Sequence, residues 1–426
     1  METVVREKAV LVGVSRPPEV LRRQVQDYLN ELELLADTAG AIVLQKWIQE
    51  RAHLDPVFYL GKGKVEELSD YVREEAVDLV IFDEDLSPVQ VRNLERVLEC
   101  KILDRTALIL QIFATHAKSY QAKLQVELAQ LEYFLPRLSG LWTHLSKQKG
   151  GIGTKGPGET QIETDRRLVW QRISTLRRKL REISQQHDTQ TKWRENVLRI
   201  ALVGYTNAGK STLMNALCPK ANVKAENQLF ATLDTTTRRM TLKQNKHALI
   251  SDTVGFIRKL PHKLVESFKS TLKEVRDADM LIHVVDASHP SYAEQIDVVE
   301  QTLRDIQASD KTVLTVFNKV DLLDAEFDFA AVKERYPTAV FVSAHRGIGV
   351  GGLLDAISRV MDKEFQPRTA RIHISHYKFI SYLHDAAEIL NKTYDGEFVE
   401  VEFRAPKKIL EHIDAKVEQL RAHSAA

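Results

Sequence analysis

The sequence has few of the features that mark secreted or membrane proteins. Its two cysteines, Cys100 and Cys218, lie far apart, so neither a disulfide framework nor a zinc site is indicated and a reducing compartment is favoured. No apolar run reaches the length of a membrane span, and the first residues do not read as a signal peptide. The formal net charge of +1 argues against a protein that coats nucleic acid along its whole surface. A cytoplasmic protein is the simplest interpretation.

A chain of 426 residues is too long for one hydrophobic core, so several domains are expected. In residues 1–112, helical patterns near 18–36, 63–75 and 88–98 separate short apolar runs. This alternation predicts an N-terminal α/β domain with a parallel sheet. The apolar runs are Ala9–Val14, Ala41–Gln45, Leu79–Phe82 and Lys101–Leu103.

Residues 113–193 are expected to form an antiparallel helical hairpin. Apolar residues recur at steps of three and four from Ala117 to Leu135 and again from Val169 to Ile183, which gives each helix one apolar stripe. The joining segment, Leu145–Arg167, contains five glycines and Pro157, so we predict a mobile loop there.

Residues 194–365 alternate strand and helix patterns again and are interpreted as a second α/β domain. Its expected strands are Leu198–Val203, His247–Ser251, Met280–Asp286, Thr312–Phe317 and Ala339–Val342. Gln366–Thr369 reads as a linker, and residues 370–426 as a small α+β domain. That domain is expected to have strands at Arg371–Ser375 and Phe398–Arg404, a helix near 377–392 and a terminal helix from Pro406.

A phosphate-binding loop follows the strand Leu198–Val203. Its residues are Gly204, Tyr205, Thr206, Asn207, Ala208, Gly209, Lys210 and Ser211, with Thr212 next along the helix. The glycines let backbone N–H groups point at phosphate oxygens, and the helix begins with its positive dipole end facing the anion. Lys210 is expected to contact the β- and γ-phosphates, and the Ser211 hydroxyl to coordinate Mg²⁺.

Three further motifs each follow a strand. Asp252 is placed to reach Mg²⁺ through water, and the Gly255 N–H to sense the γ-phosphate. The motif of Asn318, Lys319 and Asp321 fits guanine, because a carboxylate accepts from the N1–H and 2-amino groups that adenine lacks. Ser343, Ala344 and His345 would then bring a backbone N–H to the guanine O6. Ligands bind at the carboxyl ends of strands in such sheets, so the four motifs together predict a GTPase.

A switch threonine is expected between the phosphate-binding loop and Asp252. Thr232 is preferred, with Thr236 and Thr237 as alternatives. Lys210, Thr232 and Gly255 are the predicted catalytic group. Phe256 stands where many GTPases have a glutamine that orients water, so we expect slow intrinsic hydrolysis that a partner accelerates. Asn207 raises the hypothesis of a potassium ion that takes the place of an arginine finger.

The whole chain resembles the HflX family of translational GTPases, related to the Obg proteins. The resemblance rests on the stretch from Gly150 to Gln161, on the Phe-Ala-Thr-Leu-Asp segment from Phe230 and on the N-terminal α/β and helical regions. It is good over residues 5–365. In this family the threonine of that segment is taken as the Mg²⁺ ligand, which favours Thr232. Thr235 departs from the proline of many relatives and removes no ligand.

The resemblance implies a P-loop G domain, preceded by an α/β domain with a helical hairpin and followed by a small α+β domain. It also implies GTP and GDP as ligands, Mg²⁺ as cofactor, and binding to the ribosome, chiefly the 50S subunit. Stalled ribosomes would be split under stress, with the glycine-rich loop reaching toward the peptidyl-transferase region of 23S rRNA. Some members are reported to bind ATP through the N-terminal domain.

Local charge supports an RNA partner independently. Between Arg137 and Arg199 there are 14 Lys/Arg residues against six Asp/Glu, next to the glycine-rich loop. A solvated helix face is the alternative explanation of this excess. The candidate RNA-binding residues are Lys147, Lys149, Lys155, Arg166 and Arg167, with Trp142 and Trp170 as possible stacking partners.

Two other functions stay open at this level. One is a GTP-dependent switch for a protein or membrane partner, and the other is an RNA-remodelling enzyme driven by ATP, against which Asp321 argues. The Gly61–Lys64 turn is a weak second candidate for an anion site, and a plain turn before a helix is the favoured reading. No DNA partner is expected, and a monomer is the default.

Overall fold

The computed structural model describes residues 6–137, 157–191, 197–218, 229–230, 232–242, 247–259, 272–324, 326–406, 410–411 and 413–418. By its contacts the chain divides into two compact units. The N-terminal unit comprises Met1–Ser184, Asn227–Asp234 and Lys259–Lys269, and the C-terminal unit comprises Gln185–Glu226, Thr235–Arg258 and Ser270–Ala426. Among the helices of the described ranges, none is long and apolar enough to cross a membrane.

The N-terminal unit is built on a four-stranded parallel sheet. Its strands lie in the order β2 (Ile42–Glu50), β1 (Lys8–Ser15), β3 (Leu79–Phe82) and β4 (Lys101–Asp104). Helices α2 (Lys62–Glu74) and α3 (Pro88–Leu98) bury their apolar stripes on one face of this sheet. Helix α1 (Arg22–Thr38) packs on β1, where a Cβ on Gly13 would lie 2.6 Å from Val25. The predicted α/β domain is confirmed.

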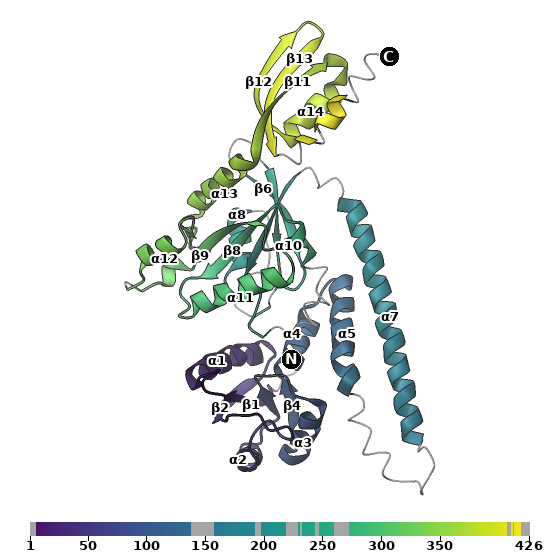
Figure 1. The fold of residues 1–426 in the computed structure, drawn as a ribbon, viewed down its shortest axis with the longest axis vertical. Helices are drawn as coiled ribbons and strands as arrows, with labels where there is room; N and C mark the ends of the chain where they lie inside the picture. Colours follow the sequence, from purple (N-terminus) through teal and green to yellow (C-terminus); the bar gives the residue numbers. More distant parts are fainter. Residues whose placement is uncertain are drawn as a thin grey trace, which may run out of the picture. The chain divides into compact units, whose positions relative to one another are not determined.

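Helices α4 (Arg105–His116) and α5 (Tyr120–Phe134), then the 3₁₀ turn η1 (Leu135–Arg137), follow β4. The apolar stripe of α5 packs against that of α7 (Pro157–Thr191), as the periodicity predicts, through Leu124, Leu128, Ile173 and Leu176 (Figure 1). The predicted loop is wrong from Pro157 onward, because α7 begins there. Proline suits a first helical turn, where its missing N–H costs no hydrogen bond. The rest of the glycine-rich segment lies outside the described residues.

A six-stranded sheet forms the centre of the C-terminal unit. Its strands lie in the order β10 (Val340–Phe341), β9 (Thr312–Asn318), β8 (Met280–Asp286), β5 (Leu198–Gly204), β7 (His247–Asp252) and β6 (Thr236–Thr241). All pairs are parallel except β6 with β7. Figure 1 also shows the helices α8 (Lys210–Leu217), α10 (Lys273–Asp277), α11 (Tyr292–Asp305), α12 (Phe329–Arg335) and α13 (Val350–Glu364). Helices α8 and α13 cover one face, and α11 and α12 pack on the other.

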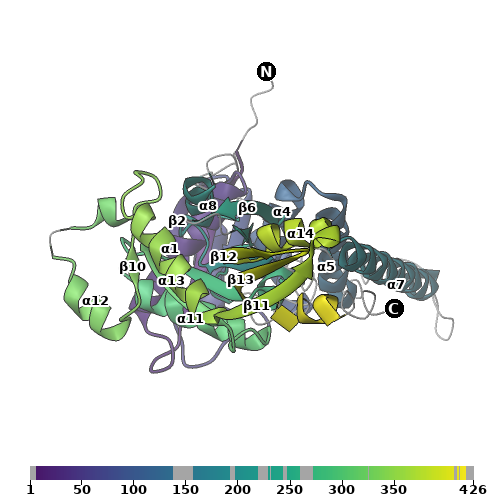
Figure 2. The same ribbon diagram turned by 90° about the horizontal axis from the view of Figure 1, so that it is seen from above.

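The chain ends in a three-stranded antiparallel sheet of order β11 (Phe365–His373), β13 (Phe398–Pro406) and β12 (Glu388–Asp395). The 3₁₀ turn η6 (Ile374–His376) leads into helix α14 (Tyr377–Ala386), which packs on one face of this sheet (Figure 2). The α+β prediction is confirmed.

Two details of that prediction are wrong. Gln366–Thr369 is part of β11 and no linker, because an edge strand tolerates the missing N–H of Pro367. The expected helix to residue 392 ends at Ala386, because Ile389, Thr393 and Tyr394 favour a strand and pair with β13.

Candidate nucleotide site

The phosphate-binding loop connects β5 to α8. Gly204 is the last residue of β5, and α8 begins at Lys210, so its first N–H groups face the loop, with Thr212 in the first turn. Gly209 has φ +92°, and a Cβ there would lie 2.2 Å from the Asn318 amide nitrogen, so only glycine fits. Asn207 also has a positive φ, +59°, and its side chain is exposed.

Lys210 lies under this loop. It is 6% exposed, and its Nζ donates to the carbonyl oxygens of Gly204 at 3.1 Å and Tyr205 at 2.8 Å. Burial lowers the pKa of Lys210 to about 8, and the nearby Asp252 carboxylate opposes this shift. A bound phosphate would oppose it further, so the site favours an anion beside Lys210.

Two oxygen donors meet at the position expected for magnesium. The Ser211 hydroxyl donates to the Asp252 carboxylate at 2.6 Å, and Asp252 is fully buried at the end of β7. A hydroxyl that donates its proton in this way keeps its lone pairs for a metal, and hard oxygen ligands suit Mg²⁺. The residues therefore fit the ion, with Ser211 as the direct ligand and Asp252 orienting it.

The candidate switch threonine lies in a different part of the molecule's organisation from the phosphate-binding loop. Thr232 and its neighbour Phe230 belong to the stretch Asn227–Asp234 of the N-terminal unit. The alternatives Thr236 and Thr237 lie in β6, where the Thr237 hydroxyl hydrogen-bonds with that of Ser251 at 2.9 Å. Since the sheet uses Thr237, Thr232 stays the preferred residue.

Gly255 and Phe256 lie directly on the phosphate-binding loop. A Cβ on Gly255 would be 2.8 Å from Thr206 Cα and 3.0 Å from Lys210 Nζ, so any larger residue would displace the loop. The Phe256 N–H donates to the Gly204 carbonyl at 3.1 Å, and the Thr206 N–H donates to the Phe256 carbonyl at 2.8 Å. The Phe256 ring is buried and carries no group that could orient water.

Asn318 ties three loops together at the end of β9. Its amide donates to the Ala208 carbonyl at 2.9 Å and accepts from the Ala344 N–H at 3.0 Å. Ser343 and Ala344 are buried and His345 is exposed. The loop expected to contact phosphate is thereby held against the loop expected to contact the base.

The guanine-selecting carboxylate is accessible. Asp321 lies in the 3₁₀ turn η5 (Val320–Leu322) just after Lys319, and it is exposed. A hydrogen bond from Ser343 lowers the pKa of Asp321, with a smaller contribution from Arg346, so the group is ionised and ready to accept. Lys319 forms an ion pair with Asp286 at 2.7 Å, which fixes the lysine stem beside the base position.

Sequence reasoning missed Asp286 and His283. Both lie in β8, and Asp286 ends that strand at the same edge as the predicted motifs, a position that could have drawn attention to it. His283 is buried, and burial together with the charge of Lys210 lowers its pKa to about 4. No motif marks His283, because a buried strand histidine looks like a core residue.

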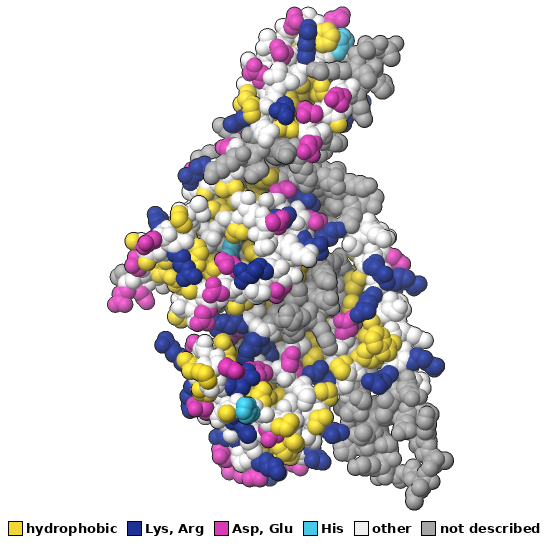
Figure 3. Space-filling model, viewed as in Figure 1, with side chains coloured by type: hydrophobic (Ala, Val, Ile, Leu, Met, Phe, Trp, Pro, Cys, Tyr) yellow, Lys and Arg dark blue, Asp and Glu magenta, His cyan; other side chains and the backbone are white. Residues whose placement is uncertain are grey.

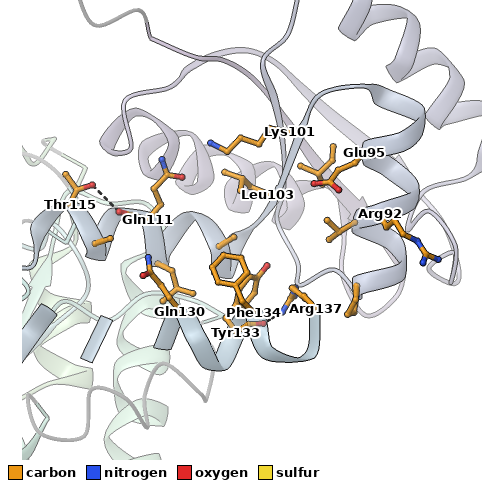
Figure 4. Close-up of a pocket in the computed structure, with 16 residues that line it drawn as sticks. Arg92, Glu95, Lys101, Leu103, Gln111, Thr115, Gln130, Tyr133, Phe134 and Arg137 are labelled. Carbon is orange, nitrogen blue, oxygen red and sulfur yellow. Dashed lines mark hydrogen bonds between the residues drawn. The ribbon is translucent and has the colours of Figure 1, made fainter. Parts of the chain in front are cut away.

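The N-terminal unit offers two further features. At the Gly61–Lys64 turn, Gly61 caps α2, and Lys64 pairs with Glu67 at 2.6 Å and lies 4.4 Å above the Trp47 ring, which supports the plain turn. A cavity of about 520 Å³ lies among α3, β4, α4 and α5. Figure 4 shows Gln111, Gln130 and Phe134 around it; its lining is mainly apolar and contains none of the nucleotide motifs.

Three family models match successive parts of the chain. "GTP-binding GTPase N-terminal" matches residues 26–114, "GTP-binding GTPase Middle Region" matches 116–194 and "50S ribosome-binding GTPase" matches 199–319. GTPase HflX of Caldanaerobacter subterraneus subsp. tengcongensis is 42% identical over 410 residues, covering 96% of this chain and 93% of that protein. GTPase HflX of Escherichia coli K12 is 43% identical, covering 86% and 85%.

Among solved structures, a GTP-binding protein from Sulfolobus solfataricus in complex with GDP aligns over 83% of this chain and 98% of its own, with 25% identity and a TM-score of 0.45. The family models and the curated relatives agree with the guanine-nucleotide motifs described above, so the prediction of GTP hydrolysis is confirmed. The chain is a GTPase that belongs to the HflX family.

Proposed function

We propose that this GTPase binds the large ribosomal subunit and splits stalled ribosomes into subunits. The GTP-bound state is the active one, and hydrolysis resets the protein. The description of the family model over residues 199–319 supports a ribosomal partner. The proposal places the protein in the cytoplasm as a monomer, with Mg²⁺ as cofactor and 23S rRNA as the main contact.

The exposed face of α7 is the observation that carries the RNA part of the proposal. Residues 166–186 contain seven Lys/Arg and one acidic residue, Glu182. The apolar stripe of α7 is buried against α5, so the basic residues face solvent. Figure 3 shows dark blue side chains along α7 with an apolar cluster among them. Such a face suits a phosphate backbone.

An exposed aromatic ring interrupts this basic face. The Trp170 side chain is 55% exposed, and Arg166 and Arg167 are exposed one turn before it. A ring between guanidinium groups provides both base stacking and phosphate contact. Lys147, Lys149 and Lys155, the other proposed RNA-binding residues, lie outside the described residues.

Two neighbouring arginines provide a matched control. Arg172 bonds to Glu127 through both of its nitrogens, at 2.6 and 2.9 Å, and Arg177 bonds to Glu132 at 2.7 Å. These guanidinium groups are already neutralised within the hairpin. They should therefore contribute less to binding an external polyanion than Arg166 and Arg167.

The test is co-sedimentation with purified 50S subunits in the presence of a non-hydrolysable GTP analogue. Replacing Arg166, Arg167 and Trp170 by alanine should weaken binding about tenfold or more, since each lost phosphate contact also flattens the salt dependence. The Arg172→Ala/Arg177→Ala pair should bind nearly as the parent does, and GDP affinity should not change in either. Unchanged sedimentation of the first variant would contradict an RNA contact at α7.

Splitting itself is measured by light scattering of intact ribosomes. The analogue-bound protein should lower the scattering, and the GDP-bound protein should not. If both forms bind ribosomes and neither lowers the scattering, the splitting activity is refuted while the ribosomal partner stands.

The proposed catalytic arrangement uses Lys210, Thr232 and Gly255, and it lacks a side chain at Phe256 that orients water. Intrinsic hydrolysis should therefore be slow, and ribosomes should accelerate it. The exposed Asn207 is the proposed potassium contact. Hydrolysis in KCl should exceed that in NaCl, and Asn207→Ala should remove the difference; equal rates in both salts would exclude the ion.

A further inference from the structure

Two short segments next to the nucleotide motifs belong to the N-terminal unit. One is Asn227–Asp234, which contains the candidate switch threonine Thr232, and the other starts at Lys259, three residues after Phe256. The motifs Gly204–Ser211 and Asp252–Phe256 belong to the C-terminal unit. The segments that respond to the γ-phosphate are thus held by contacts of the N-terminal unit.

The first segment is attached on both sides of Thr232. The Phe230 side chain is 2% exposed, and its ring lies edge-on to Phe113 with centroids 4.7 Å apart. The Asp234 carboxylate accepts from the N–H groups of Lys118 and Ser119 at 3.1 Å each and from the Ser119 hydroxyl. These contacts lie at the beginning of α5, where a carboxylate is also favoured by the helix dipole.

The second segment is attached by a single side chain. The Lys259 ammonium lies 2.5 Å from the Asp83 carboxylate, 3.7 Å from that of Glu84 and 4.5 Å above the Tyr28 ring. Asp83 directly follows β3, is 3% exposed and also pairs with Arg105 at 2.8 Å. The ammonium therefore sits at the carboxyl edge of the sheet, where α/β folds place ligands.

The residues just before Lys259 are paired with the phosphate-binding loop. Besides the two hydrogen bonds of Phe256, the Arg258 N–H donates to the Tyr205 hydroxyl at 2.9 Å. Gly255 lies so near Lys210 that an added Cβ would be 3.0 Å from its Nζ. A γ-phosphate that contacts both the Lys210 ammonium and the Gly255 N–H has to enter between them and lift residues 255–258 from the loop.

We propose that Asp83 is a positioning residue for this GTPase: it holds Lys259, and through Lys259 it holds residues 255–258 in the arrangement that excludes the γ-phosphate. GTP binding draws on the chain between Gly255 and Lys259 and withdraws the ammonium from Asp83. GDP has no γ-phosphate and leaves the ion pair in place. The ion pair therefore favours GDP over GTP and reports the bound nucleotide to the N-terminal sheet.

The test compares the affinities of the full-length protein for GDP and for a non-hydrolysable GTP analogue by calorimetry. Lys259→Gln should bind the analogue about five- to tenfold more tightly with GDP affinity unchanged, since a partly exposed ion pair to a buried carboxylate is worth about that factor. Lys259→Arg keeps the cation and should restore the parent ratio. Lys62→Gln, at an exposed lysine of the same unit, should leave the ratio unchanged.

Asp83→Asn tests the partner. Alone it should shift the ratio as Lys259→Gln does, and adding Lys259→Gln to it should cause no further shift. Three results would overturn the proposal: an unchanged ratio in Lys259→Gln, an equal shift for GDP and the analogue, or a Lys259→Arg variant that behaves like Lys259→Gln.

Discussion

Asn318 offers the sharpest test of how the nucleotide site is held together. The side chain is 2% exposed and satisfies two buried backbone groups, the Ala208 carbonyl and the Ala344 N–H. In Asn318→Ala both groups lose their partner while 0% and 7% of the two residues is exposed, so water reaches them poorly. Each unsatisfied buried group costs about 1–3 kcal/mol. The expected loss is therefore about 2–5 kcal/mol.

Part of that loss should appear as stability and part as affinity. Urea unfolding of the nucleotide-free protein should show a lower midpoint with an unchanged slope. GDP affinity should fall at least about tenfold, because the loops that hold phosphate and base are no longer tied together. Asn391→Ala, on the exposed strand β12, is the control and should change neither quantity. If Asn318→Ala unfolds at the parent's urea concentration and binds GDP normally, the two hydrogen bonds do not support the site.

Three further results are expected. Burial lowers the pKa of Lys210 from 10.5 to about 8, so between these values the unfolded chain binds more protons and its stability contribution rises with pH, while GDP affinity should fall above pH 8 because phosphate binds the charged form; constant affinity to pH 9.5 would contradict this. Burial and Lys210 lower the pKa of His283 from 6.5 to about 4, so the unfolded chain again binds more protons there and stability should fall as pH drops from 6.5 to 4, a loss that urea midpoints should show reduced in His283→Gln. Asp321→Asn should lose GDP affinity at least about a hundredfold and gain xanthosine diphosphate, whose 2-oxo group accepts from an amide; retained GDP binding in titrations would refute the role of the carboxylate.

The sequence predicts the nucleotide site well because each motif directly follows an apolar strand. Strand β8 is predicted to the residue, and Asp252 and Asn318 end β7 and β9 at the same edge of the sheet. Local pattern and parallel topology suffice to bring these residues together. The tie made by Asn318 is not visible in the sequence, because it depends on the distance between two loops.

The errors arise where distant pairing outweighs local pattern. Residues 388–392 continue a helical stripe, yet they form a strand because β13 offers a partner. Pro367 reads as a linker only until its strand is seen to lie at an edge. Nothing local to Lys259 or Asp234 marks them as members of the N-terminal unit, since their partners are more than a hundred residues away.

The position of the tryptophans has a practical consequence. All four, Trp47, Trp142, Trp170 and Trp193, precede Leu198, where the GTPase sheet begins. Trp47 lies beneath the Lys64 ammonium beside Tyr71, and the Trp170 ring is largely in water. Native fluorescence therefore has no emitter beside guanine or phosphate. A spectral change that follows nucleotide addition is a signal carried from one half of the molecule to the other, and it needs no dye.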